Sequence, residues 1–146
     1  MINDTIQVTG QLGIVLRDEH GNVKEERLHP NLVVTAGKAW IAARMKATGA
    51  PNEMSHMAVG TGTSAAADAN TTLGTESARV TLASSVSGAV VTYTATFSPG
   101  TGTAALTEAG VFNAASAGTM LCRTVFPVVN KGASDSLAIT WTVTVG

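Results

Sequence analysis

The segment "SLAITWTVTV" at residues 136–145 alternates strictly between large apolar and small or hydroxyl-bearing side chains. Its odd-numbered residues, from Leu137 to Val145, are apolar, and its even-numbered residues are Ser, Ala and Thr. Successive side chains of a β-strand point to opposite faces, so this pattern predicts a strand with one face in a core. The segment "AVVTYTATF" at 89–97 has the same pattern and predicts a second such strand.

Other strand patterns follow one another along the chain with short turns between them. An N-terminal hairpin is predicted at about 5–29, with its turn at "DEHGN" (18–22) and its end at Pro30 and Asn31. Further strands are predicted at 54–59, 78–86, 105–113 and 119–126, with hairpin turns at 87–88 and 114–118. Without βαβ alternation, this succession predicts one mainly β domain over 1–146, an antiparallel β-sandwich or jelly-roll-like barrel. Periodicity alone does not distinguish the sandwich from the barrel.

One short α-helix is predicted at about 35–46, where Trp40, Ile41, Arg44 and Met45 have helical spacing. Thr35 is its predicted N-cap, since a threonine hydroxyl can accept a hydrogen bond from an unpaired amide of the first turn. A second, smaller helix could lie near 72–78.

Charged residues form 13% of the chain, against roughly 25% in typical soluble domains. Weak surface charge favours association, so we expect a homo-oligomer or contact with other subunits. The net charge of −1 gives no global attraction for nucleic acid or an anionic membrane, and neither is expected as a partner. The N-terminal segment lacks the pattern of a signal peptide, and no apolar run approaches the ~20 residues of a membrane helix.

The stretch "HMAVGTGTSA" at 56–65 fits the dinucleotide fingerprint G-x-G-x-x-G/A through Gly60, Gly62 and Ala65. That site requires a helix directly after the glycines, whose N-terminus holds the pyrophosphate. The following "SAAADANTTLG" has no amphipathic pattern, so we interpret the glycines as turn residues and expect no cofactor.

No other catalytic or metal-binding arrangement stands out, so no catalytic residue, no metal ligand and no enzyme activity is predicted. The histidines lack partners at metal-ligand spacing, the only cysteine lies in an apolar run that predicts burial, and the aspartates are placed as turn formers. These residues are His20, His29, His56, Cys122, Asp4, Asp18, Asp68 and Asp135.

A structural ion pair is predicted between Glu108 and Arg123. If the strands at 105–113 and 119–126 pair across the "AASAG" turn, the two residues come directly opposite each other, which stabilises by roughly 0.2–1 kcal/mol. The alternative is two independent surface charges.

Several blocks in succession resemble a known class of proteins. The blocks "NLVVTAGKAWIA", "MAVGTGTS", "TTLGTESAR", "LTEAGVFNAASAGTMLCRTVF" and "DSLAITWTVTV" are similar to small virion structural proteins of tailed bacteriophages. Their order is also similar to the N-terminal attachment module of phage tail-collar fibre proteins. The resemblance covers roughly residues 31–145 and implies a structural or attachment role in the virion, without catalytic residues.

The resemblance leaves the position in the virion open. Because the chain ends at its last core strand, without a shaft or receptor-binding tip, we favour a capsid decoration or cement protein that bridges major capsid subunits. A tail or connector adaptor is the alternative, and a host-glycan binding module is a third. Two contact surfaces are predicted. The first is the hairpin, represented by Ile6, Val8, Leu12 and Ile14, and its deletion should abolish particle binding. The second is the loop at 60–72, represented by Gly60 and Gly62.

Overall fold

The computed structural model describes residues 6–46 and 48–146, and these are mainly β, with 54% of the chain in strands. The first residue of the predicted hairpin, Thr5, and the predicted turn former Asp4 lie outside the described residues. The elements are β1 (Val8–Arg17), β2 (Val23–Val33), α1 (Thr35–Arg44), β3 (His56–Gly60), β4 (Glu76–Thr81), β5 (Ala83–Ser87), β6 (Val90–Phe97), β7 (Ala104–Phe112), β8 (Met120–Lys131) and β9 (Ser136–Val145). The predicted mainly β class with one short helix is thereby confirmed for the described part.

All described strand pairs are antiparallel, and they run in the order β4-β3-β7-β8-β2-β1-β9-β6-β5. The order divides into leaf B (β4, β3, β7, β8) and leaf A (β2, β1, β9, β6, β5). Only Leu32 and Val33 of β2 pair with β8, so β2 turns the corner between the leaves. Leu82 alone separates β4 from β5, the two ends of the order. The fold is therefore a nearly closed barrel or sandwich, intermediate between the two predicted architectures.

The main core lies between the two leaves. Strand β9 has the predicted alternation, because its apolar residues from Leu137 to Val143 are at most 4% exposed while Thr140 is exposed. The facing strands add the other large side chains of this core, among them Leu12, Ile14, Leu16, Phe97, Leu106, Val111 and Leu121.

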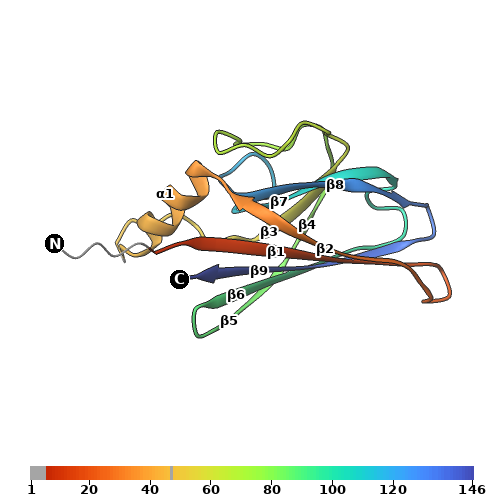
Figure 1. Ribbon diagram of the computed structural model, residues 1–146, viewed down its shortest axis with the longest axis horizontal. Coiled ribbons are helices and arrows are strands. Elements are labelled where there is room, and N and C mark those ends of the chain that lie inside the picture. The colour runs from red at the N-terminus through yellow and green to blue at the C-terminus, as the bar shows by residue number, and fades with distance from the viewer. Residues whose placement is uncertain (1–5, 47) are drawn as a thin grey trace.

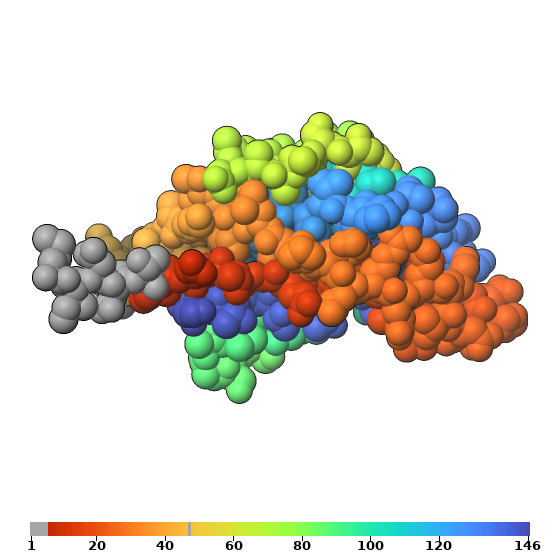
Figure 2. Space-filling model, in the orientation of Figure 1, coloured from red at the N-terminus to blue at the C-terminus, as the bar shows by residue number. Residues whose placement is uncertain are grey.

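A second, smaller core lies on the outer face of leaf B. Ala58, Phe112 and Met120 from the strands pack there against Val34, before α1, and Leu73, from the loop 61–75. Figure 1 shows this loop in yellow-green along one side of the molecule, with α1 at one end and the β1–β2 turn projecting at the other. Figure 2 shows the same loop lying over the blue surface of β8.

Four local predictions are wrong. Strand β2 continues through Pro30 to Val33, because at Pro30 it is paired on the β1 side only and its missing N–H breaks no pairing.

The predicted helix cap is also wrong. Thr35 is the first helical residue, and Val34 is the N-cap, without a side-chain cap. The Thr35 N–H instead donates to the Asp68 carbonyl. The segment near 72–78 holds no described helix, since pairing with β3 draws Glu76–Thr81 into β4. The hairpin turn is one residue later than predicted, at 88–89, with Gly88 at φ +57°.

Candidate functional site

A buried ion pair beneath the loop 61–75 is the first candidate site. Glu108 of β7 is 0% exposed and Arg123 of β8 is 2% exposed, and the Arg123 Nη2 lies 2.8 Å from the Glu108 Oε2. The Arg123 Nε lies 3.2 Å from the same oxygen. Both groups point from leaf B toward the loop, so the pair sits between the sheet and its covering segment.

The Glu108 carboxylate is fully engaged by backbone amides of the loop. Its Oε1 accepts from the N–H groups of Gly62 (2.9 Å) and Thr75 (2.7 Å), and its Oε2 accepts from the Gly74 N–H at 2.8 Å. Gly62 and Gly74–Thr75 are the two ends of the loop. One carboxylate therefore fastens both ends of the loop to the sheet.

Arg123 holds the middle of the same loop. Its Nη1 donates to the Asn70 Oδ1 at 2.9 Å, and its Nη2 donates to the Ser64 carbonyl at 3.0 Å. The guanidinium thus bridges β7 and the loop, and no side chain of the pair is left to bind a substrate. The arrangement acts as a structural clamp.

The hydrogen bonds decide the protonation of the clamp. Burial alone raises the pKa of Glu108, but the amide hydrogen bonds from Thr75 and Gly74, followed by the Arg123 side chain, hold the pKa below its ordinary value of 4.5. Glu108 is therefore ionised at neutral pH. An ionised, fully paired carboxylate is a poor general acid or base.

The predicted Glu108–Arg123 ion pair is present, but the predicted register is wrong. Glu108 lies opposite Val125, and Arg123 lies opposite Gly110. The predicted register is already one residue off beside the turn, where Phe112 pairs with Met120, and the irregularity between Val111 and Phe112 shifts the pairing by one residue more. The long arginine side chain spans this diagonal, so the charged ends still meet.

The fingerprint glycines of the sequence lie in this clamp. A side chain on Gly60 would lie 2.2 Å from the Thr75 carbonyl, and one on Gly62 would lie 2.6 Å from the Glu108 carboxylate. The chain continues from these glycines into the loop and then into β4, with no helix in between. The Gly62 N–H that a phosphate would need already binds the internal carboxylate. Gly60 is buried, so it cannot serve as the predicted contact surface, and Gly62 is occupied within the chain.

The structure also corrects the contact residues predicted in the hairpin. Leu12 and Ile14 are at most 1% exposed and belong to the main core, because β1 is a central strand of leaf A. Val8 is partly buried against the same core. Ile6, which is 72% exposed, is the one of these four that remains available at the surface.

The other titratable candidates are dispersed or paired. Cys122 is fully buried, and burial raises the pKa of its thiol above the usual range. Tyr93 is likewise buried, which raises the pKa of its hydroxyl to about 12. In the described residues, no group of three or more His, Cys, Asp or Glu side chains is placed to hold a metal ion.

Sequence reasoning missed a second buried polar cluster at the turn between β8 and β9. Asp135 accepts from the Lys24 Nζ at 2.8 Å and from the Gly132 N–H at 2.7 Å. These hydrogen bonds and the Lys24 charge hold the pKa of Asp135 below its ordinary value. Lys131, 2% exposed, donates to the Ser98 carbonyl at 3.0 Å. The cluster closes a turn of the chain, and no sequence motif distinguishes it from other turns.

The outer face of leaf A is the second candidate site, as a surface for contact. Its side chains are those that alternate with the core residues on β1, β9, β6 and β5, and on these strands only Arg17, at the hairpin end of β1, is charged. We call it the threonine face; it comprises Thr9, Gln11, Gly13, Val15, Arg17, Ser136, Ala138, Thr140, Thr142, Thr144, Val90, Thr92, Thr94, Thr96, Ala83, Ser85 and Ser87, with Glu26, Leu28 and Pro30 of β2 beside β1.

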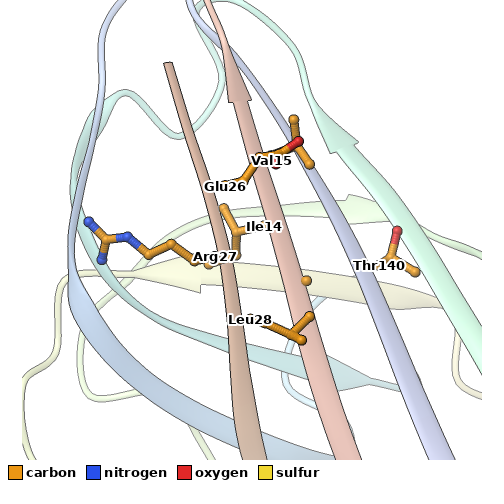
Figure 3. Close-up of a pocket in the computed structure, with 7 residues that line it drawn as sticks. Ile14, Val15, Glu26, Arg27, Leu28 and Thr140 are labelled. Atoms are coloured by element: carbon orange, nitrogen blue, oxygen red, sulfur yellow. The ribbon is translucent and has the colours of Figure 1, made fainter. Parts of the chain in front are cut away.

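The threonine face contains a shallow depression of about 370 Å³ at Gly13. Leu28, Thr140, Val15 and Glu26 contribute to its lining. In Figure 3 the Leu28 side chain extends toward the strand of Thr140, whereas the Arg27 guanidinium extends the opposite way. The depression and its apolar neighbour Leu28 were not singled out from the sequence, although an isolated glycine inside a strand pattern is a signal of close approach.

Comparisons of the chain with protein-family models, curated proteins and solved structures found no match. Within the described residues, no helix has the length and apolar character needed to cross a membrane.

Proposed function

We propose that this chain is a non-enzymatic structural protein of a tailed-bacteriophage virion, bound to the capsid as a decoration or cement protein. The observation that carries the proposal is the threonine face, a broad sheet surface whose charged side chains, Arg17 and Glu26, lie only toward its hairpin end and which is covered by no described segment of the chain. The resemblance of the sequence blocks to virion proteins supplies the setting.

A sheet face with few charges suits a subunit of an assembly. Exposed surfaces of isolated soluble domains are typically about 25–35% charged, which keeps them apart. Away from Arg17 and Glu26, the threonine face instead offers small hydroxyl and methyl groups that a neighbouring subunit can cover without burying an unpaired charge. Each bound copy adds interface area to the shell. Because the copies bind the assembled shell and not the free capsid subunits, their binding stabilises the assembled state by mass action.

The turn of the β1–β2 hairpin is the proposed contact arm toward the capsid. It projects from one end of the molecule (Figure 1) and carries Arg17, Asp18, Glu19 and His20 at or near its tip. Deletion of the whole hairpin would not test this, because β1 carries core residues and the domain would unfold. Replacement of the tip 18–22 by Asn-Gly leaves both strands intact and should abolish particle binding. Unchanged binding would exclude the tip as the arm.

Aromatic placement does not favour a glycan-binding module. Such a module would present exposed aromatic rings, but Trp141, Tyr93 and all three phenylalanines are buried. Trp40 is half-buried against the core and donates its indole N–H to the Asn52 carbonyl at 2.8 Å. The remaining alternative is a tail or connector adaptor.

The proposal is tested by quantitative mass spectrometry of heads and tails separated from purified particles of the virus that encodes the chain. We expect many copies per head, in fixed proportion to the major capsid protein, and none in tails. A few copies confined to tails would replace decoration by the adaptor role. Absence from both fractions would overturn the virion assignment.

A further inference from the structure

Gly13 is the one glycine of the chain whose missing side chain is unexplained by the chain itself. The other fourteen of the fifteen glycines either have a φ in the left-handed region or would place a side chain within 3.1 Å of a neighbouring atom. At Gly13, an added Cβ would lie 3.6 Å from the Thr140 carbonyl and 3.7 Å from the Leu28 side chain, which are ordinary contacts. Glycine inside a strand weakens the strand and often marks a bulge, a bend, or the close approach of a ligand or another backbone, and the register at Gly13 is regular on both sides.

The surroundings of Gly13 combine a depression with a protruding apolar group. Gly13 and Leu28 are directly paired across β1 and β2, and Leu28 is 65% exposed beside the depression. A partner for this surface must offer an apolar group that enters the depression and a hollow that receives Leu28. The threonine face itself offers both.

We propose that two copies of the chain pair through their threonine faces about a two-fold axis near Gly13, with Leu28 of each copy seated in the Gly13 depression of the other. A two-fold contact brings the same patch of both subunits together, so any charge on the patch would meet its like. Across β1, β9, β6 and β5 this face carries one charged side chain, Arg17 at the hairpin end of β1, so few like charges would meet near the axis. Glu26 of β2 also lines the depression; it lies opposite Val15, two residues nearer the hairpin tip than Leu28.

The size of the face is adequate for such a pair. Five strands about 4.8 Å apart, each about eight residues long at about 3.3 Å per residue, present on the order of 600 Å² of sheet. The side chains that protrude from the sheet make its accessible area larger than this value. A standard protein–protein interface covers about 800 Å² per partner. The contact is therefore of the size of a specific, reversible dimer.

This pairing is a property of the chain alone, so its test uses purified protein and is independent of any virion. Sedimentation velocity over a concentration series should show the wild-type mass rising from 14.8 kDa toward twice that value. Thr140→Lys places a like charge at the centre of the face and should raise the dimer dissociation constant by at least about tenfold. Thr81→Lys, on an exposed threonine of β4 outside the face, is the matched control and should dimerise as the wild type does.

Two further variants protect the test against a folding defect and locate the contact. Gly13→Val fills the depression with a residue that favours strands, so it should fold and lose the dimer. In Thr140→Cys the new thiol is the only accessible one, because Cys122 is fully buried, and a short bismaleimide should link two copies. Thr81→Cys should remain unlinked. A wild-type chain that stays monomeric, a trimer, or equal dimerisation of the Thr140→Lys and Thr81→Lys variants would overturn the proposal.

Discussion

The outer face of leaf B lies under the loop 61–75, whereas no described segment covers the outer face of leaf A. Beneath the loop, two charged side chains are almost fully buried, and each is paired and hydrogen-bonded. On the threonine face, where water would solvate a charge at no cost, the charged side chains are Arg17 and Glu26, both toward the hairpin end. Leaf B therefore buries charge beneath its loop, whereas most of the outer face of leaf A carries none.

The contrast separates the demands of folding from those of assembly. The loop of leaf B requires Glu108 and Arg123, because its backbone amides and carbonyls find their partners there. No described loop lies on the outer side of leaf A, so no backbone groups there require buried charged partners. Its small number of charges suits a subunit contact.

The largest expected effect is that of removing the charge beneath the loop. Glu108→Gln keeps the shape of the side chain but leaves the Arg123 guanidinium buried without its counter-ion, which typically costs about 3–5 kcal/mol. We expect the free energy of unfolding, from urea titration, to fall by that amount. Glu26→Gln, on an exposed side chain of leaf A, is the control and should change it by no more than about 0.5 kcal/mol. Equal small losses would show that the clamp does not stabilise the fold.

The next largest expected effect is a steric clash at Gly60, which also lies in leaf B. Gly60→Ala places a methyl group 2.2 Å from the Thr75 carbonyl, which is backbone and must move. We expect a loss of about 1–3 kcal/mol in the free energy of unfolding. Faster limited proteolysis within residues 61–75 should accompany it, because the loop end is displaced. Wild-type stability and proteolysis would contradict the close packing of this glycine.

The main architecture could be predicted from the sequence because it depends on local patterns. The alternation of 136–145 and 89–97 places apolar side chains on one face of each strand, whatever its neighbours. The continuation of β2 through Pro30 could not be predicted from the sequence. A strand tolerates proline where it lacks a partner on one side, and which side has a partner depends on the tertiary fold.

The candidate sites were predictable only in part. Glu108 and Arg123 could be paired because a short turn joins their strands, but the irregularity between Val111 and Phe112, which changes their register, leaves no trace in the residue types. The amides that surround Glu108 come from a loop more than thirty residues away in the sequence. The threonine face could be recognised only once the strand order was known, because that order places β1, β9 and β6 side by side.

A smaller effect is expected from acid. The pKa of Glu108 is lowered in the folded protein relative to 4.5, so its contribution to stability is fully present above about 4.5 and is lost as pH falls through the folded value. One such group gives a slope of at most about 1.4 kcal/mol per pH unit. The difference in unfolding free energy between the wild type and Glu108→Gln should therefore narrow below pH 4.5. The lowered pKa of Asp135 acts in the same direction in both proteins and cancels in the difference.

The smallest expected effect has the opposite sign and lies on the other face. Gly13→Ala meets only ordinary contacts and no left-handed φ, so the methyl group restricts the unfolded chain without straining the fold. We expect the monomer to gain about 0.5–1 kcal/mol in free energy of unfolding, measured at concentrations too low for pairing. The same substitution thus destabilises leaf B at Gly60 and stabilises leaf A at Gly13. A loss of stability at Gly13 would mean that folding itself requires this glycine, and the argument that a partner requires it would fail. A gain would mean that folding does not require this glycine, and the pairing experiments would then decide whether a partner does.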